Sequence, residues 1–125
     1  MPNKQVLAAV TDLMFIAKIQ DAAKRAGLEA LFVKSKQQAL EAAAHQPALI
    51  ILDLNDRAID ALALIAELKA HEQTRAVHLL GYVSHIETDL RRAALANGCD
   101  EVLPRSALSK NLPTILQDHA IKGEV

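Results

Sequence analysis

Residues 49–68, LIILDLNDRAIDALALIAEL, contain the pattern that decides the fold of this chain. The five residues from Ala48 to Leu52 are all apolar, which is typical of a strand covered on both faces, as in a parallel sheet. The acidic Asp53 follows directly, and apolar residues recur at helical spacing after Asp60. This stretch predicts a buried strand that ends in a carboxylate, followed by a short loop and a helix.

The same order of a short apolar run and a helical segment repeats along the chain. The other predicted strands are Val6–Val10, Ala30–Val33, Val77–Val83 and Glu101–Pro104. Strands that alternate with helices through short loops indicate a parallel sheet with helices on both faces. We therefore expect one α/β domain over residues 1–125, with a five-stranded doubly wound parallel sheet.

Local signals predict where the helices begin and end. The first helix should start near Thr11 or Asp12 and stop at Gly27, because glycine readily adopts the left-handed conformation that ends helices. Capping-box patterns predict helix starts at Ser35, which precedes Gln38 by three residues, and at residues 84–87. The third helix should begin at Asp60. The fifth should begin at Ser109, which places Pro113 in its first turn.

Composition excludes several classes of protein. Hydrophobic residues make up 51% of the chain, too many for a disordered segment, whereas aromatic residues make up only 2%. The net charge of −1 gives no reason to expect nucleic acid or a membrane surface as a partner. Cys99 is the only cysteine, so no internal disulfide can form, and no apolar run is long enough for a signal peptide or a membrane span. We expect a cytoplasmic protein.

Polar residues that follow the predicted strands mark the candidate site. In a doubly wound sheet, ligands bind at the carboxyl ends of the strands, near the reversal in strand order. Asp53 is the leading candidate there, with three uses open: a nucleophile toward a phosphoryl donor, a metal ligand or a loop cap. The neighbours expected around it are Thr11, Asp12, Asn55, Val83, Ser84 and Arg105.

Three segments of the chain resemble a response-regulator receiver domain, the phospho-accepting module of two-component signalling. Residues 49–68 are similar to the family's central strand, phospho-accepting aspartate and following helix, without a gap. Residues 4–27 align with its first strand and helix, and residues 98–105, GCDEVLPR, with its fifth strand. The resemblance implies a flavodoxin-like fold with receiver topology, and it assigns Asp53 as the phospho-acceptor.

The chain departs from the family at most of its working positions. The metal-binding acidic pair falls on Val10 and Thr11, with Asp12 one position too late. The Thr or Ser that contacts the phosphoryl group falls on Val83, and the family's Lys falls on Arg105. Asp12, Asp53 and Asn55 would make a poor Mg²⁺ cage, because this ion requires near-ideal octahedral oxygen coordination. Arg105 keeps its positive charge, and we expect it to form a salt bridge to Asp53.

These departures favour a degenerate receiver, without enzymatic activity or a cofactor, that signals through protein contacts. Its partner would be a sensor kinase, a downstream signalling protein or a second copy of the chain. Because the sequence ends soon after the fifth predicted helix, we expect a stand-alone module. The resemblance also implies a contact face bearing Ile86, Leu90, Leu108, Leu112 and Ile115. An amphipathic helix would bury most of these side chains, so we expect most of them to face the core.

Two alternatives remain open. One is a phosphorylatable receiver that uses Asp53 with an atypical metal site, in which a one-residue shift after the first strand brings Asp12 closer. The other is a flavodoxin-like module that binds a small molecule. The loop after the first strand argues against this second alternative, because residues 10–14, VTDLM, contain no glycine to cradle a phosphate.

Overall fold

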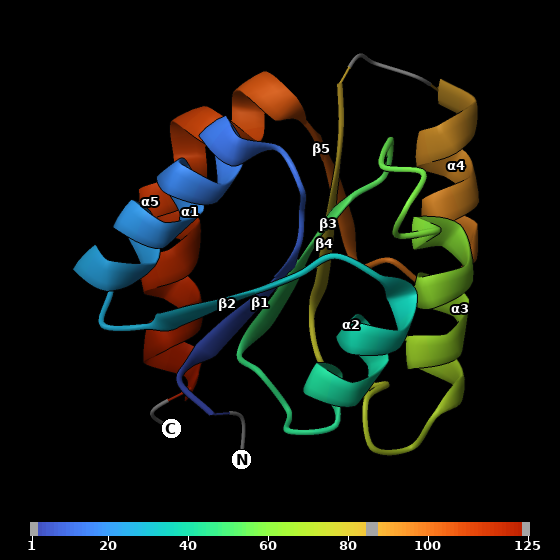
Figure 1. Ribbon diagram of the computed structural model, residues 1–125, viewed down its shortest axis with the longest axis horizontal. Coiled ribbons are helices and arrows are strands. Elements are labelled where there is room, and N and C mark those ends of the chain that lie inside the picture. Colours follow the sequence, from blue (N-terminus) through green and yellow to red (C-terminus); the bar gives the residue numbers. More distant parts are fainter. Residues whose placement is uncertain (1–2, 85–87, 124–125) are drawn as a thin grey trace.

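Five strands alternate with five helices in the computed structural model, over the residues that it describes, 3–84 and 88–123 (Figure 1). The strands are β1 (Gln5–Ala9), β2 (Glu29–Val33), β3 (Leu49–Asp53), β4 (Leu79–Val83) and β5 (Glu101–Pro104). The helices are α1 (Leu13–Arg25), α2 (Lys36–Ala43), α3 (Ala61–Ala70), α4 (Thr88–Ala96) and α5 (Arg105–Gly123).

The strands form one parallel sheet in the order β2-β1-β3-β4-β5. The prediction of a five-stranded doubly wound parallel sheet is therefore confirmed. The strand order reverses at β1, which lies between β2 and β3. Because all strands are parallel, the loops that follow β1, β3, β4 and β5 meet at the same edge of the sheet, beside this reversal.

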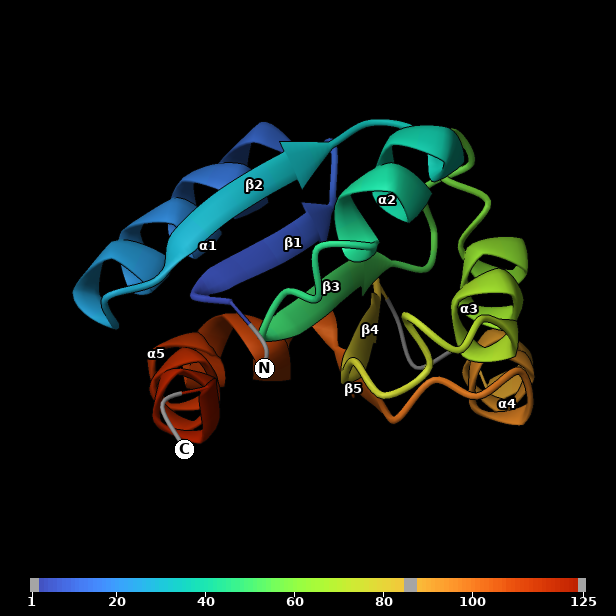
Figure 2. The same ribbon diagram turned by 90° about the horizontal axis from the view of Figure 1, so that it is seen from below.

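Helices cover both faces of the sheet, as Figure 2 shows from below. On one face, Leu49 and Ile51 of β3 belong to a buried cluster that includes residues of α1 and α5. On the other face, Ile50 and Leu52 belong to a cluster that includes residues of α2, α3 and α4. Each of these four β3 side chains is fully buried, which explains why the strand sequence shows no polar alternation.

The structure confirms most predicted helix ends. Ser35 caps α2, with its Oγ accepting a hydrogen bond of 3.1 Å from the backbone N–H of Gln38. Gly27, just after α1, has a φ of 75°, a conformation that glycine adopts without strain. Asp60 is the residue before α3, as predicted. Residues 85–87, on which most of the predicted start of the fourth helix falls, lie outside the described part of the chain.

The prediction for the start of the fifth helix is wrong. Helix α5 begins at Arg105, so Pro113 lies in its interior and not in its first turn. The buried Leu108 belongs to the core cluster between the sheet and helices α1 and α5, and its packing stabilises the additional turn. Pro113 removes one backbone N–H donor from the helix interior. The expectation that a proline lies in the first turn of a helix placed the predicted start too late.

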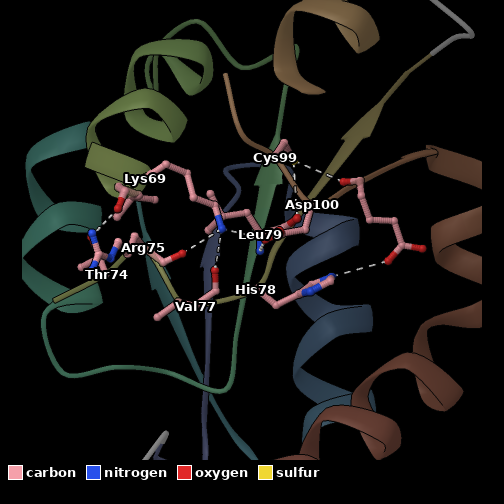
Figure 3. A network of polar contacts seen from close by, with 10 residues as sticks. Lys69, Thr74, Arg75, Val77, His78, Leu79, Cys99 and Asp100 are labelled. Atoms are coloured by element: carbon pink, nitrogen blue, oxygen red, sulfur yellow. Dashed lines mark hydrogen bonds and ion pairs between the residues drawn. The ribbon is translucent and has the colours of Figure 1, made fainter. Parts of the chain in front are cut away.

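A polar network around Lys69 stabilises the edge of the sheet where the strands begin, opposite the edge where the loops after β1, β3, β4 and β5 meet (Figure 3). The Lys69 Nζ donates to the carbonyls of Arg75 and Val77 at 3.1 and 3.2 Å and pairs with Asp100 Oδ2 at 2.9 Å. The same Asp100 oxygen accepts a hydrogen bond of 2.8 Å from the backbone N–H of Leu79. The network therefore holds the α3–β4 loop against the start of β5. None of the helices in the described part of the chain is long and apolar enough to cross a membrane.

Candidate functional site

Asp53 is the last residue of β3 and lies half-exposed at the edge where the loops meet. Its Oδ1 accepts a hydrogen bond of 3.0 Å from the backbone N–H of Asn55. Desolvation raises the pKa of this carboxyl above the usual range, and the negative charge of Asp56 adds to the rise. Asp53 is thus a carboxylate whose ionised form the surrounding structure disfavours.

Asp12 caps helix α1, one of the roles predicted for it. Its Oδ1 accepts hydrogen bonds from the backbone N–H groups of Met14 and Phe15, at 2.9 and 3.2 Å. Its Oδ2 pairs with Nη2 of Arg105. The bond from Phe15, together with Arg105, lowers the pKa of Asp12. Both carboxylate oxygens of Asp12 are therefore already engaged by the protein.

The expected salt bridge between Arg105 and Asp53 is wrong, because Arg105 pairs with Asp12. The physical reason is that α5 begins at Arg105 and α1 begins beside Asp12, so the two side chains face each other across neighbouring helix starts. The Arg105 guanidinium also lies over the ring of Phe15, 5.0 Å from its centroid. Arg105 lowers the pKa of Asp53 only as a minor effect of its charge.

Two further contacts join the loops at this edge. Thr11 Oγ1 donates to Asp56 Oδ2 at 2.5 Å, and the other Asp56 oxygen accepts from the backbone N–H of Ala58 at 2.9 Å. The Asn55 Oδ1 accepts from the backbone N–H of Ser84 at 2.8 Å. We call the three inter-loop contacts, Arg105–Asp12, Thr11–Asp56 and Asn55–Ser84, the rim contacts. Together they connect the loops after β1, β3, β4 and β5.

The remaining neighbours predicted for Asp53 lie at this edge but add little polar chemistry. Val83 is buried at the end of β4, and its side chain cannot hydrogen-bond a phosphoryl oxygen. Val10, at the first of the two positions of the family's acidic pair, is also fully buried. Ser84 is exposed, and its backbone N–H donates the hydrogen bond to Asn55 Oδ1.

An aromatic pair beside Asp53 was not predicted. Phe15 and Tyr82 stack with their ring centroids 4.7 Å apart and 13° between their planes. Tyr82 is paired with Asp53 in the β3–β4 register, and its buried hydroxyl forms no hydrogen bond of normal geometry. Burial, together with the charge of Asp53, raises the pKa of this hydroxyl. The sequence offered only one hint of this pair, the scarcity of aromatic residues. The chain has one tyrosine and two phenylalanines, and two of these three residues stack here.

The residues at this edge do not fit the magnesium ion that the resemblance implies. Asp12 is used by α1 and Arg105, and Asp56 is used by Thr11 and Ala58. No group of three or more histidine, cysteine, aspartate or glutamate residues could hold a metal ion within residues 3–84 and 88–123. The edge is therefore held together by hydrogen bonds and an ion pair between protein side chains.

The contact face implied by the resemblance is mostly buried, as expected. Leu108 and Leu112 are almost completely buried, and Leu90 and Ile115 are partly buried against the two core clusters. Ile86 lies outside the described residues. Large exposed apolar side chains occur instead at the start of α1, where Leu13 is 81% exposed and Met14 69% exposed.

Solved structures of response regulators have the same fold. A response regulator from Hahella chejuensis has a TM-score of 0.84 and 17% identity, over 97% of this chain and 98% of that one. The chemotaxis response regulator CheY4 of Vibrio cholerae has a TM-score of 0.78 and 18% identity, over 92% and 97%. The receiver domain of the sensor histidine kinase PA1611 from Pseudomonas aeruginosa, solved with magnesium in its active-site cleft, has a TM-score of 0.78 and 20% identity, over 93% and 96%.

These similarities show that the chain has the receiver fold of two-component signalling proteins. They show the fold alone, because the sequences are so different. No protein-family model matches the chain, and no curated protein matches it.

Proposed function

We propose that this chain is a signalling module with a receiver fold and a degenerate phospho-acceptor site, and that it acts through contacts with other proteins. The observation that carries this proposal is the engagement of the site carboxylates by the protein itself. Both oxygens of Asp12 and both oxygens of Asp56 accept hydrogen bonds from other groups of the chain.

Efficient attack by Asp53 on a phosphoryl group would require positive charge to neutralise the incoming anion. Magnesium would have to displace Arg105 from Asp12 or Thr11 from Asp56 to gain a second carboxylate. Val83 offers no hydrogen bond to a phosphoryl oxygen. The carboxylates that magnesium would need are therefore already engaged, and the hydroxyl that would contact the phosphoryl group is replaced by the apolar Val83.

The rim contacts support a fixed arrangement of the loops after β1, β3, β4 and β5. A receiver with this arrangement would present the same surface to a sensor kinase or a downstream signalling protein whether or not a phosphoryl donor is present. A cytoplasmic role without enzymatic activity belongs to this proposal.

Phosphotransfer from acetyl phosphate tests the proposal directly. Intact mass is measured with and without Mg²⁺ for the parent chain and for Asp53→Asn, beside an ordinary receiver domain as the positive control. We expect no Mg²⁺-dependent mass gain in the parent under conditions that label the control. A gain of one phosphoryl group that disappears in Asp53→Asn would overturn the proposal and support an atypical phosphorylatable receiver.

A further inference from the structure

A groove between the starts of α1 and α5 has chemistry that the proposed function does not use. Its volume is about 330 Å³, and its polar lining consists of Lys18, Ser84, Arg105, Ser106 and Ser109. Met14 and Phe15 complete the described lining as an apolar wall. The volume lies at the lower end of the range for small-molecule pockets, about 300–1,000 Å³.

The groove is positively charged. Lys18 and Arg105 contribute two cations from different helices, and none of the described lining residues carries a carboxylate. Lys18 Nζ donates to the neutral Ser109 Oγ at 2.7 Å, and none of the ion pairs among the described residues includes it. Asp12 offsets the charge of Arg105, so the charge of Lys18 remains unneutralised.

Both cationic groups already have contacts within the protein. Arg105 is fixed on one side by Asp12 and on the other by the Phe15 ring beneath it. Lys18 and Ser109 join α1 to α5 across the groove. The fixed groups lower the entropy cost of binding, because the ligand has fewer side chains to order.

We propose that this groove binds a small phosphate monoester. The phosphate oxygens would accept hydrogen bonds from Lys18, from Arg105 and from the hydroxyls of Ser106 and Ser109, a donor set that suits a group with several acceptor oxygens. The organic part of the ligand would lie against Met14, which is 69% exposed. This site is distinct from Asp53, which does not line the groove, and the inference does not depend on whether Asp53 is phosphorylated.

Titration calorimetry at low ionic strength with EDTA present tests this inference, with adenosine monophosphate, inorganic phosphate and adenosine as probes. We expect adenosine monophosphate to bind more tightly than adenosine or inorganic phosphate. Lys18→Gln should weaken binding of the monophosphate about tenfold or more, since a hydrogen bond to a charged group contributes about 1.5–3 kcal/mol. Lys24→Gln is the matched control, because Lys24 is exposed on the same helix and outside the groove.

Two results would overturn the inference: equal affinity of the Lys18→Gln and Lys24→Gln proteins, or no binding of adenosine monophosphate. Binding of inorganic phosphate at the same strength as the monoester would also overturn it, because the organic part would then contribute nothing. Asp53→Asn separates this inference from the proposed function. The groove assignment requires this variant to bind about as the parent does. Markedly tighter binding in Asp53→Asn would place the anion beside the phospho-acceptor, because the removed carboxylate charge would have repelled it, and would refute the groove assignment.

Discussion

Gly98, in the turn after α4, is a position outside the core at which an added methyl group should destabilise the fold. Its φ is 109°, which a residue with a side chain adopts only with strain. A Cβ added there would lie 2.8 Å from Cγ of Lys69 and 3.3 Å from its Cβ. Gly27 provides the matched control, because its φ is 75° and an added Cβ would meet nothing within 4 Å.

The two substitutions should differ by the clash with Lys69. Positive φ alone costs a residue with a Cβ about 1–2 kcal/mol, which is the full expected cost of Gly27→Ala. In Gly98→Ala, the stem of Lys69 must also move, which weakens its bonds to Arg75, Val77 and Asp100. These groups are partly exposed, so we expect about 1–2 kcal/mol from their loss and about 2–4 kcal/mol in total.

Urea and thermal unfolding followed by far-ultraviolet circular dichroism measure both costs. A difference of 1 kcal/mol corresponds to about 3–5 °C in Tm for a domain of this size. Lys69→Ala removes the Cγ that causes the clash, so the Gly98→Ala, Lys69→Ala double variant should be more stable than the sum of the single effects by about 1 kcal/mol. The reasoning fails if Gly98→Ala costs no more than Gly27→Ala, or if the two changes at the clash site are additive.

Three further predictions concern charged and buried polar side chains. Arg105→Gln should lower stability by about 1 kcal/mol, because the ion pair it removes is half-exposed, while the exposed Arg57→Gln should have no effect in the same urea titration. Tyr82→Phe should change stability by less than about 1 kcal/mol, because the buried hydroxyl forms no hydrogen bond of normal geometry and interacts only weakly with the Asp53 carboxylate; a larger loss would reveal a strong bond between the two groups. Asp53→Asn should stabilise the fold at pH 7 and Asp100→Asn should destabilise it, because the pKa of Asp53 is raised and that of Asp100 is lowered in the fold. Unfolding at a series of pH values should show the Asp53 difference shrinking as the pH falls towards about 4, and the Asp100 difference shrinking only as the pH falls below about 4.

The opposite signs at Asp53 and Asp100 come from their surroundings. Desolvation raises the pKa of both, but at Asp100 the hydrogen bonds from the Leu79 N–H and from Lys69 outweigh it. Ionised Asp100 therefore contributes stability above the unfolded pKa, and this contribution is lost as the pH falls through the folded pKa. At Asp53, desolvation outweighs the hydrogen bond from the Asn55 N–H. The folded state therefore favours the protonated carboxyl, and ionisation at higher pH costs stability.

Most of the fold could be predicted from the sequence because strands covered on both faces leave continuous apolar runs. The run that ends at Leu52 and the glycine that follows α1 are local signals that tertiary packing did not override. The start of α5 could not be predicted, because its first turn is stabilised by the packing of Leu108 in the core, and the position of Pro113 misled the local reading.

The candidate residues lie at one edge of the sheet, as predicted, but their pairing could not be predicted. The rule for parallel sheets gathered Thr11, Asp53 and Arg105 at one edge without any knowledge of side-chain direction. Which carboxylate Arg105 contacts depends on the angle between α1 and α5, and Thr11 reaches Asp56 across two loops. Such distances between side chains are set by packing and leave no periodic trace in the sequence.

The stacked position of Tyr82 has a practical consequence. The chain has no tryptophan and no second tyrosine, so its tyrosine emission arises from one ring that lies against Phe15, beside Asp53. Any event that shifts α1 against the sheet, or that changes the charge on Asp53, should change the emission of this ring. The unlabelled protein thus carries its own optical reporter at the edge where its loops meet.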